Sequence, residues 1–551
     1  MTLFSKNRTI GSWQRREIEP EAGSDAIKKA LSRVTEPISL IDMDGRLGIG
    51  YKGRTIIGDT ETDRSSDYPL FAYVPALHPQ DLGDSAFKNA HGLQYAYVAG
   101  AMANGITSAR MVEEAGRAGM LGFFGAAGLT PSEIESAIEK LKKRCSDFPF
   151  GFNLIHSPND PDLEQTVVDL YLRENIRLVS ASAYLDLTLP LVYYRVSGIH
   201  LDPDGNIICP NKIIAKVSRV EVAEKFLSPP PDKLLAQLVA DNRITPKEAA
   251  LAKQIPVAED LTAEADSGGH TDNRPAISLL PTMIALRDDI LKSYPSPPSL
   301  RIGLGGGIAD PVSTAAAFSM GAAYVLTGSI NQSCIESGTS DTVRQMLAGA
   351  SQADVAMAPA ADMFEMGVKV QVLKRGTMFP FRAAKLYELY TAHDRYEMIP
   401  EKQKQLLERD FFRDSFDTEW DRTKSFFNNR DPKQAERGEI DPKHRMALVF
   451  RSYLGQSSNW ANTGNPDRRI DYQIWCGPSM GAFNQWVKGS FLEDVEARRV
   501  VTVAKNLLLG ASVIIRTNWL KHQGVRLPSG LGVFKPMPPE DIDRLLSSTL
   551  G

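Results

Sequence analysis

The residues best suited to chemistry lie in one short run, Glu264 to Asp272, which reads EADSGGHTD. His270 can donate or accept a proton near neutral pH, and the glycines before it let the backbone approach a ligand closely. A histidine on its own is more often structural, but its place after Gly-Gly favours a catalytic role. Glu264 and Asp266 resemble a metal pair, yet no second His or Cys stands at ligand spacing, so we expect no metal.

Two glycine-rich segments further along predict a site for an anion. Residues Gly303–Ile308 read GLGGGI, and Thr327–Ser329 read TGS. Consecutive glycines let backbone N–H groups approach an anion, and the helix that Asp310-Pro311 opens adds a favourable dipole. The first segment is not the GxGxxG dinucleotide fingerprint, because Ile308 occupies the last position. One such loop is weak evidence, but the pair predicts a bound phosphate.

Three other segments place small or polar residues directly after apolar runs: Asn153 in GFNLIH, Lys216 in IIAKVSR, and Gly100–Gly105, GAMANG. The Lys216 ammonium could stabilise an anionic ring electrostatically, and a lysine that only reaches solvent is the alternative. The Asn153 amide could bond to a ring edge, and the small residues leave room for a flat ring. The sequence contains no GxSxG elbow for a serine nucleophile.

These segments belong to a repeated pattern in which a short apolar run precedes a helical stretch. The runs are Tyr95–Ala101, Leu121–Phe124, Phe150–Leu154, Ile176–Ser180, Ile213–Val217, Ala258–Glu264, Leu300–Leu304 and Ala323–Thr327. Eight such units in roughly 250 residues favour an α/β fold, the (β/α)8 TIM barrel, over an open doubly wound sheet. Barrels hold phosphate in the loops after strands seven and eight, where both glycine-rich segments stand. Flavin mononucleotide (FMN) is a ligand of that kind.

The chain divides into three parts around the barrel. Residues 1–85 predict a small β-rich N-terminal subdomain with one short helix at Ser24–Val34, because apolar bursts are split by Asp-Gly and Gly pairs. We assign residues 86–350 to the barrel and residues 351–551 to a helical C-terminal domain. The barrel is interrupted at residues 228–255, which predict an inserted helical pair that either shapes a binding cleft or is simply solvated.

The C-terminal part combines aromatic and charged residues. Pro380–Met398 and Glu401–Asn428 predict long charged helices, the polar stretch 428–445 follows, and Met446–Gly510 predicts further helices. Aromatic side chains at helical spacing are more often core or interface than a cofactor site. Dimerisation or docking is one hypothesis for this domain. Inside the barrel, Asp202–Gly205 is a turn signal that predicts a hairpin.

Composition narrows the class of protein. A length of 551 residues predicts several domains, and 63 Lys and Arg against 67 Asp and Glu give no positive excess for nucleic acid. The longest near-apolar stretch, Leu507–Ile515, is far shorter than the ~20 residues that span a bilayer. The N-terminus has no apolar signal region, and the four cysteines stand far apart without a CxxC. We therefore expect a cytoplasmic protein.

Taken together, several motifs resemble one known group. They are AGAMANGITS, FNLIHSP, KVSR, EADSGGHTDNRP, GLGGGI and LTGSIN. These resemble the nitronate-monooxygenase-like FMN barrels and, within them, the PfaD family. That family consists of trans-acting enoyl reductases of polyunsaturated fatty acid synthases and of polyketide synthases without integrated acyltransferases. The likeness extends to MAPAADMFEMGVKVQVLKRGT and DYQIWCGPSMGAFNQW, and it covers most of the chain from about residue 80.

The resemblance implies an oxidoreductase that uses FMN and NADPH to reduce enoyl thioesters on acyl carrier protein in polyunsaturated fatty acid synthesis. It implies that His270 is a proton donor or an enolate stabiliser and that Lys216 is a second catalytic residue. The cofactor contacts that it implies are Ala101, Met102, Ala103, Asn153, Lys216, Ser267, Gly269, Gly305, Gly306, Gly307, Gly328 and Ser329. The alternatives are the same reaction in a polyketide synthase, a nitronate monooxygenase, and a non-catalytic docking protein. A homodimer is a further hypothesis.

Overall fold

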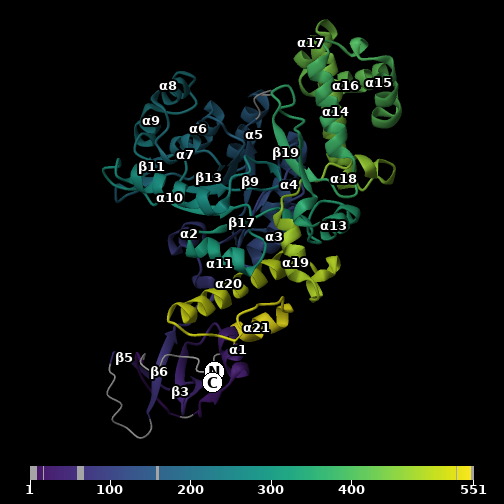
Figure 1. The fold of residues 1–551 in the computed structure, drawn as a ribbon. Coiled ribbons are helices and arrows are strands. Elements are labelled where there is room, and N and C mark those ends of the chain that lie inside the picture. Colours follow the sequence, from purple (N-terminus) through teal and green to yellow (C-terminus); the bar gives the residue numbers. More distant parts are fainter. Residues whose placement is uncertain (1–8, 17, 59–66, 157–160, 529, 548–551) are drawn as a thin grey trace.

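The computed structural model describes residues 9–16, 18–58, 67–156, 161–528 and 530–547, and its centre is a closed barrel (Figure 1). Its parallel strands are β7 (Tyr97–Ala99), β8 (Leu121–Phe124), β9 (Gly151–Ile155), β10 (Leu178–Ser182), β13 (Lys212–Val217), β14 (Asp260–Glu264), β16 (Arg301–Gly305) and β17 (Val325–Thr327). Strand β17 pairs with β7 and closes the ring. The predicted (β/α)8 barrel is confirmed.

A helix follows each strand of the barrel. These helices are α3 (Ala109–Arg117), α4 (Pro131–Arg144), α5 (Pro161–Arg173), α6 (Leu189–Val196), α7 (Val220–Leu227), α10 (Ala276–Leu291), α11 (Pro311–Ser319) and α13 (Asp341–Ala348), with the short α12 (Ser329–Gln332) before the last. Helix α4 begins where the sequence predicts, because Thr130 and Glu133 form a capping box. The Glu133 carboxylate accepts the Thr130 amide at 2.7 Å.

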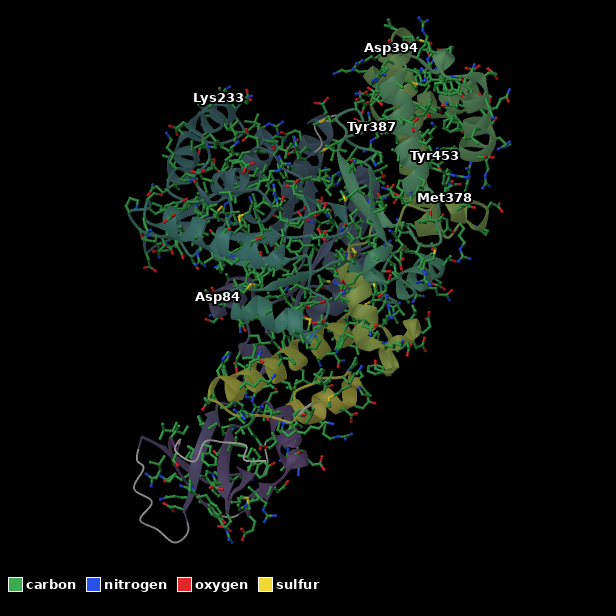
Figure 2. All side chains as sticks on the ribbon, viewed as in Figure 1. Asp84, Lys233, Met378, Tyr387, Asp394 and Tyr453 are labelled. Atoms are coloured by element: carbon green, nitrogen blue, oxygen red, sulfur yellow. The ribbon has the colours of Figure 1, made fainter. Side chains whose placement is uncertain are left out.

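Both predicted interruptions of the barrel are present. Strands β11 (His200–Leu201) and β12 (Ile207–Ile208) form the hairpin. Helices α8 (Asp232–Ala240) and α9 (Pro246–Ala252) form the inserted pair. Figure 2 shows Lys233 at the outer end of this pair. Leu235 and Leu238 of α8 are buried in the barrel's hydrophobic core, so the insertion is docked on the barrel by one apolar face.

The N-terminal residues form a six-stranded antiparallel sheet. Its strands are β1 (Gly11–Gln14), β2 (Glu21–Ala22), β3 (Ile38–Met43), β4 (Arg46–Gly50), β5 (Arg54–Ile57) and β6 (Asp67–Val74), in the order β2-β4-β3-β6-β1-β5. Helix α1 (Ser24–Ser32) packs with this sheet against the long helix α20 (Val500–His522). The β-rich element that the sequence predicts is therefore present.

Helix α20 connects the sheet to the barrel. It is long and apolar enough to cross a membrane by length and composition, but 78% of its most apolar window is buried inside the protein. Its Arg516 is fully buried and donates to the carbonyl oxygen of Arg33 at 2.7 Å. Because α20 packs against the N-terminal sheet on one side and against α11 of the barrel on the other, it is a core helix. The last helix, α21 (Pro539–Ser547), packs beside it.

The helices after residue 350 divide between two places. Helices α14 (Phe379–Ala392), α15 (Glu401–Leu406), α16 (Phe416–Arg430), α17 (Pro432–Ile440) and α18 (Pro442–Thr463) form a helical lobe beside the barrel mouth with its own core. Figure 2 shows Tyr387 and Tyr453 inside this lobe and Asp394 at its outer end. Helices α19 (Ser479–Val487) and α20 instead join the barrel core. The helices after residue 350 thus contribute to two hydrophobic cores, and the predicted domain division stays a prediction.

Some C-terminal elements differ from the prediction. The polar stretch 428–445 contains helix α17 and the start of α18, and Pro432 and Pro442 stand at the first positions of these two helices, where proline is favourable. The long helix predicted at Glu401–Asn428 is interrupted at Arg413, which adopts a left-handed conformation with φ 61°. Strands β18 (Val355–Pro359) and β19 (Lys369–Leu373), which were not predicted, form a small sheet with β15 (Gly269–His270).

Candidate active site

The carboxyl ends of the barrel strands open into a cavity of about 1080 Å³, and the helical lobe supplies its other wall. Every site residue predicted from the sequence lines this cavity: Ala101, Met102, Ala103, Asn153, Lys216, Ser267, Gly269, His270, Gly305, Gly306, Gly307, Gly328 and Ser329. The structure therefore brings the predicted residues together. Their individual roles stay predictions.

The two glycine-rich loops present bare backbone to the cavity. Gly306 and Gly307 have φ values of 85° and 75°, which favour glycine. A Cβ at Gly306 would lie 2.6 Å from the Ala265 carbonyl oxygen, whereas no heavy atom lies within 4 Å of one at Gly328. The first loop is thus packed tightly from behind, and the second faces open space.

The predicted contribution of the α11 dipole stays a prediction, but the start of this helix is capped by its own residues. The Asp310 carboxylate caps this helix and accepts the Ser313 amide at 2.8 Å, while the Ser313 hydroxyl accepts the Ala309 amide at 3.0 Å. The Ser313 amide of α11 and the Ala309 amide just before the helix are therefore satisfied internally. Among the described residues, the amides of Gly307 and Gly328 have no protein acceptor, so these loop amides are available to an anion.

A segment from far along the chain packs on the loop that carries His270. A Cβ at Gly268 would lie 2.8 Å from the Cys476 amide nitrogen, so the two backbones touch. The Gly477 amide donates to the Ser329 hydroxyl at 3.0 Å. The close approach that Gly268 permits is therefore to protein backbone. Sequence reasoning missed these contacts, although the motif CGPSMG was a visible signal.

His270 is positioned by a strand and by a carboxylate. Strand β15 pairs with β19, with His270 opposite Val370. The His270 Nε2 atom lies 3.2 Å from Asp362 Oδ1, and the histidine side chain is 33% exposed. Burial lowers the pKa of His270, but the hydrogen bond and negative charge of Asp362 outweigh burial and raise it above its ordinary value. Asp362, in MAPAADMFEMG, is a residue that sequence reasoning missed.

Lys216 is the next-to-last residue of β13, whereas Asn153 lies in the middle of β9, which continues to Ile155. The Lys216 Nζ atom is 2.7 Å from Glu264 Oε1, and the two side chains are 23% and 13% exposed. Glu264 therefore holds the ammonium in place and offsets part of its charge. The Asn153 side-chain oxygen accepts the Ala127 amide at 3.1 Å. That bond directs the remaining part of the amide to the cavity that Asn153 lines.

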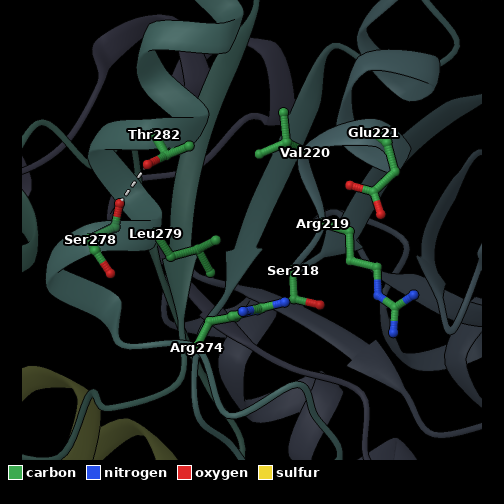
Figure 3. A pocket seen from close by; sticks show the side chains of 8 residues that line it. All are labelled: Ser218, Arg219, Val220, Glu221, Arg274, Ser278, Leu279 and Thr282. Atoms are coloured by element: carbon green, nitrogen blue, oxygen red, sulfur yellow. Dashed lines mark hydrogen bonds between the residues drawn. The ribbon is translucent and has the colours of Figure 1, made fainter.

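A smaller cavity of about 510 Å³ lies beside the mouth, between the first turns of α7 and α10 (Figure 3). At its edge, Ser218 and Arg219 bind the Asp272 carboxylate at 2.6 and 3.0 Å. The Thr282 hydroxyl donates to the Ser278 carbonyl oxygen at 2.9 Å, the dashed line in Figure 3. The bonds from Ser218 and Arg219 to Asp272 fix the end of the loop that carries His270 against the residues that follow β13. Within the described ranges, no group of three or more His, Cys, Asp or Glu could hold a metal ion.

Comparison with protein families identifies two regions. Residues 84–404 match the family described as "Nitronate monooxygenase". Residues 393–472 match the family described as "[Acyl-carrier-protein] S-malonyltransferase, inserted helical domain", and this range covers much of the helical lobe.

Two curated relatives come from multienzyme systems. The chain is 46% identical over 449 residues to one of the polyunsaturated fatty acid synthase subunits of Thraustochytrium sp., covering 80% of this chain and 30% of that protein. It is 45% identical over 437 residues to the polyketide biosynthesis protein PksE of Bacillus subtilis, covering 79% of this chain and 57% of that protein. The chain thus spans only part of the length of each of these relatives.

One solved structure is similar over nearly its whole length. The crystal structure of the enoyl reductase domain of MlnA, from the macrolactin biosynthesis cluster of Bacillus amyloliquefaciens, has a TM-score of 0.76 and 40% sequence identity. The match covers 80% of this chain and 99% of that domain. The two proteins therefore share one fold over most of this chain.

Proposed function

This chain belongs to the nitronate monooxygenase family of flavin-dependent oxidoreductases, and from that premise we propose that it is an enoyl reductase with FMN as its cofactor. The observation that carries the proposal is the 40% identity to the MlnA enoyl reductase domain over 99% of that domain. The proposed substrate is an α,β-unsaturated thioester on an acyl carrier protein, and the proposed reductant is NADPH.

The residues at the mouth fit a flavin with a phosphate tail. The amides of Gly307 and Gly328 are available donors, and the space in front of Gly328 is open. Asn153 and Lys216 would contact the ring, because both line the cavity. When bound, FMN would supply the hydride chemistry that connects NADPH with the substrate.

The protein's own task is to manage charge and a proton on the substrate. A hydride that arrives at the β-carbon leaves negative charge on the thioester oxygen, and a proton must then reach the α-carbon. We assign the proton transfer to His270, because Asp362 raises its pKa and favours the imidazolium. Its partial exposure lets water restore the proton afterwards.

The proposed partner is the acyl carrier protein of a synthase. Support comes from the relative named as part of a polyunsaturated fatty acid synthase and from the helical lobe's match to a region of an acyl-carrier-protein malonyltransferase. We propose polyunsaturated fatty acid synthesis as the pathway. A polyketide pathway is the alternative, supported by the similarity to PksE.

The proposal is tested by flavin analysis and substrate-dependent turnover of the purified protein. We expect FMN to be retained, and NADPH oxidation to require an enoyl thioester, with long-chain substrates preferred over short polyketide-like ones. The opposite chain-length preference would favour the polyketide pathway. Oxygen consumption with an alkyl nitronate and no NADPH would instead identify a nitronate monooxygenase. Failure to bind FMN would contradict both enzymes and favour a docking protein.

A further inference from the structure

A second histidine in the cavity is held by a buried carboxylate that the proposed mechanism does not use. Glu164 of α5 has a side chain that is only 3% exposed. It accepts hydrogen bonds from the Tyr184 phenol at 2.9 Å and from the Thr188 hydroxyl. The His156 Nδ1 atom lies 3.2 Å from its other oxygen. Three side chains thus converge on one carboxylate that the barrel buries.

The hydrogen bonds fix which nitrogen of His156 faces the cavity. An ionised carboxylate only accepts, so Nδ1 must carry the hydrogen that it shares with Glu164. Burial, together with the charge and hydrogen bond of Glu164, raises the pKa of Tyr184 well above its ordinary value, so the phenol stays a donor. The His156 ring stacks on Tyr184 with centroids 5.4 Å apart and lines the cavity. Nε2 is therefore the polar atom left for a ligand.

His156 and His270 stand on different sides of the same cavity. His156 follows β9 and His270 follows β14, and β10 and β13 lie between these strands in the barrel. Each imidazole has a carboxylate partner, but the partners differ in exposure. Glu164 is 3% exposed and Asp362 is 47% exposed. Both histidines are thus paired with a carboxylate. The partner of His156 is buried, whereas the partner of His270 is open to water.

We propose that His156 is a second catalytic histidine and that Glu164 is its positioning residue. As an imidazolium, His156 shares its Nδ1 hydrogen with Glu164 and donates its Nε2 hydrogen to the carbonyl oxygen of the bound thioester. This inference rests on the proposed reductase function. A donor that is fixed before the reaction suits the stabilisation of developing charge, because no reorganisation is then needed. A donor in contact with water suits proton delivery, because it must be recharged in each turnover.

The atoms and electrons balance with these two roles. The β-carbon gains a hydride, and the electrons of the double bond move through the α-carbon onto the thioester oxygen, where the His156 Nε2–H donates. The electron pair then returns to the α-carbon, which takes a proton from the His270 imidazolium. Water restores that proton, so each turnover consumes one NADPH and one proton and releases the saturated thioester.

The test compares His156→Ala and His156→Gln with the native protein and with His200→Ala. His200 is an exposed histidine of the β11–β12 hairpin and serves as the matched control. For each protein we measure the melting temperature, FMN content, anaerobic bleaching by NADPH, and reoxidation by an enoyl thioester. We expect His156→Ala to bind and reduce FMN normally and to lose ~100- to 1000-fold in kcat/KM for the thioester, as for loss of one oxyanion donor.

The other variants make the result specific. His156→Gln keeps a neutral donor and should lose less than His156→Ala, and His200→Ala should match the native protein. Glu164→Gln should lower kcat/KM without changing FMN content. Native-like reoxidation of a folded His156→Ala would overturn this inference alone. Loss of FMN or of NADPH bleaching in that variant would also overturn it, because His156 would then be a cofactor contact. A native protein that no enoyl thioester reoxidises would overturn the proposed function as well.

Discussion

The two ends of the barrel use similar charged residues for different purposes. At the amino end, Asp260 opens β14 and Arg301 opens β16, and Arg301 Nε lies 2.6 Å from Asp260 Oδ1. His91, at the end of α2 (Ser85–His91), lies 2.8 Å from the same carboxylate. All three side chains are buried. At the carboxyl end, His270–Asp362 and Lys216–Glu264 are partly exposed pairs that line a cavity.

The difference shows what makes an ion pair available for chemistry. Burial raises the pKa of Asp260, but hydrogen bonds from His91 and Arg301 outweigh burial and lower it. This carboxylate has its partners inside the protein and nothing left for a ligand. The pairs at the mouth keep atoms that face the cavity. The amino end of the barrel should therefore set stability, and the carboxyl end should set activity.

The largest expected effect is a loss of stability caused by a substitution at the amino end of the barrel. Arg301→Leu leaves Asp260 buried beside His91 alone, and loss of one partner of a buried pair costs about 3–5 kcal/mol. We expect the free energy of unfolding in urea to fall by that amount. The kcat per folded molecule should stay native. A variant as stable as the native protein, or a folded variant without activity, would contradict the division between the two ends.

The second effect is a loss of activity without a loss of stability, caused by a substitution at the barrel mouth. His270→Ala removes the proposed acid, and general acid catalysis typically contributes ~100- to 10000-fold. We expect kcat to fall within that range while the melting temperature changes little, because the side chain is partly exposed. His78→Ala, at a histidine outside the cavity lining, is the control. Retention of native kcat by His270→Ala would show that another group delivers the proton.

A third variant separates cofactor binding from catalysis. Gly306→Ala places a Cβ 2.6 Å from the Ala265 carbonyl oxygen at a φ of 85°, where a side chain is disfavoured. We expect the loop to shift and FMN affinity to fall about tenfold or more, measured by fluorescence titration. Gly205→Ala is the control, because its φ is also positive, at 84°, but it lies in the β11–β12 turn. Equal FMN affinity for both variants would remove Gly306 from the phosphate site.

The smallest effect is a shift in pH dependence. Asp362 raises the pKa of His270, so the imidazolium persists to higher pH, and activity that needs it is present below that pKa and lost above it. In Asp362→Asn the alkaline fall of kcat/KM should move to lower pH. Asp289→Asn, at an exposed surface pair with Lys292, should leave the profile unchanged. An unmoved profile in Asp362→Asn would contradict the role of this carboxylate.

The barrel and its mouth could be predicted from the sequence because their signals are local. Runs such as Leu121–Phe124 are apolar for the length of a strand, and Gly306-Gly307 follows directly after one. Strand β15 has only two residues, and it exists because β19, which begins about a hundred residues later, pairs with it. Asp362 and Cys476 likewise reach the mouth through tertiary contacts that no local pattern reveals.

The most direct test of the central claim is anaerobic reoxidation of the NADPH-reduced protein by an enoyl thioester, followed by its visible spectrum and by mass analysis of the product. We predict that the oxidised flavin spectrum returns as one equivalent of saturated thioester forms, and that this step is slowed in His270→Ala but not in His78→Ala. A flavin that stays reduced with the enoyl thioester and reoxidises only on admission of oxygen would contradict the assignment of the barrel mouth to enoyl reduction.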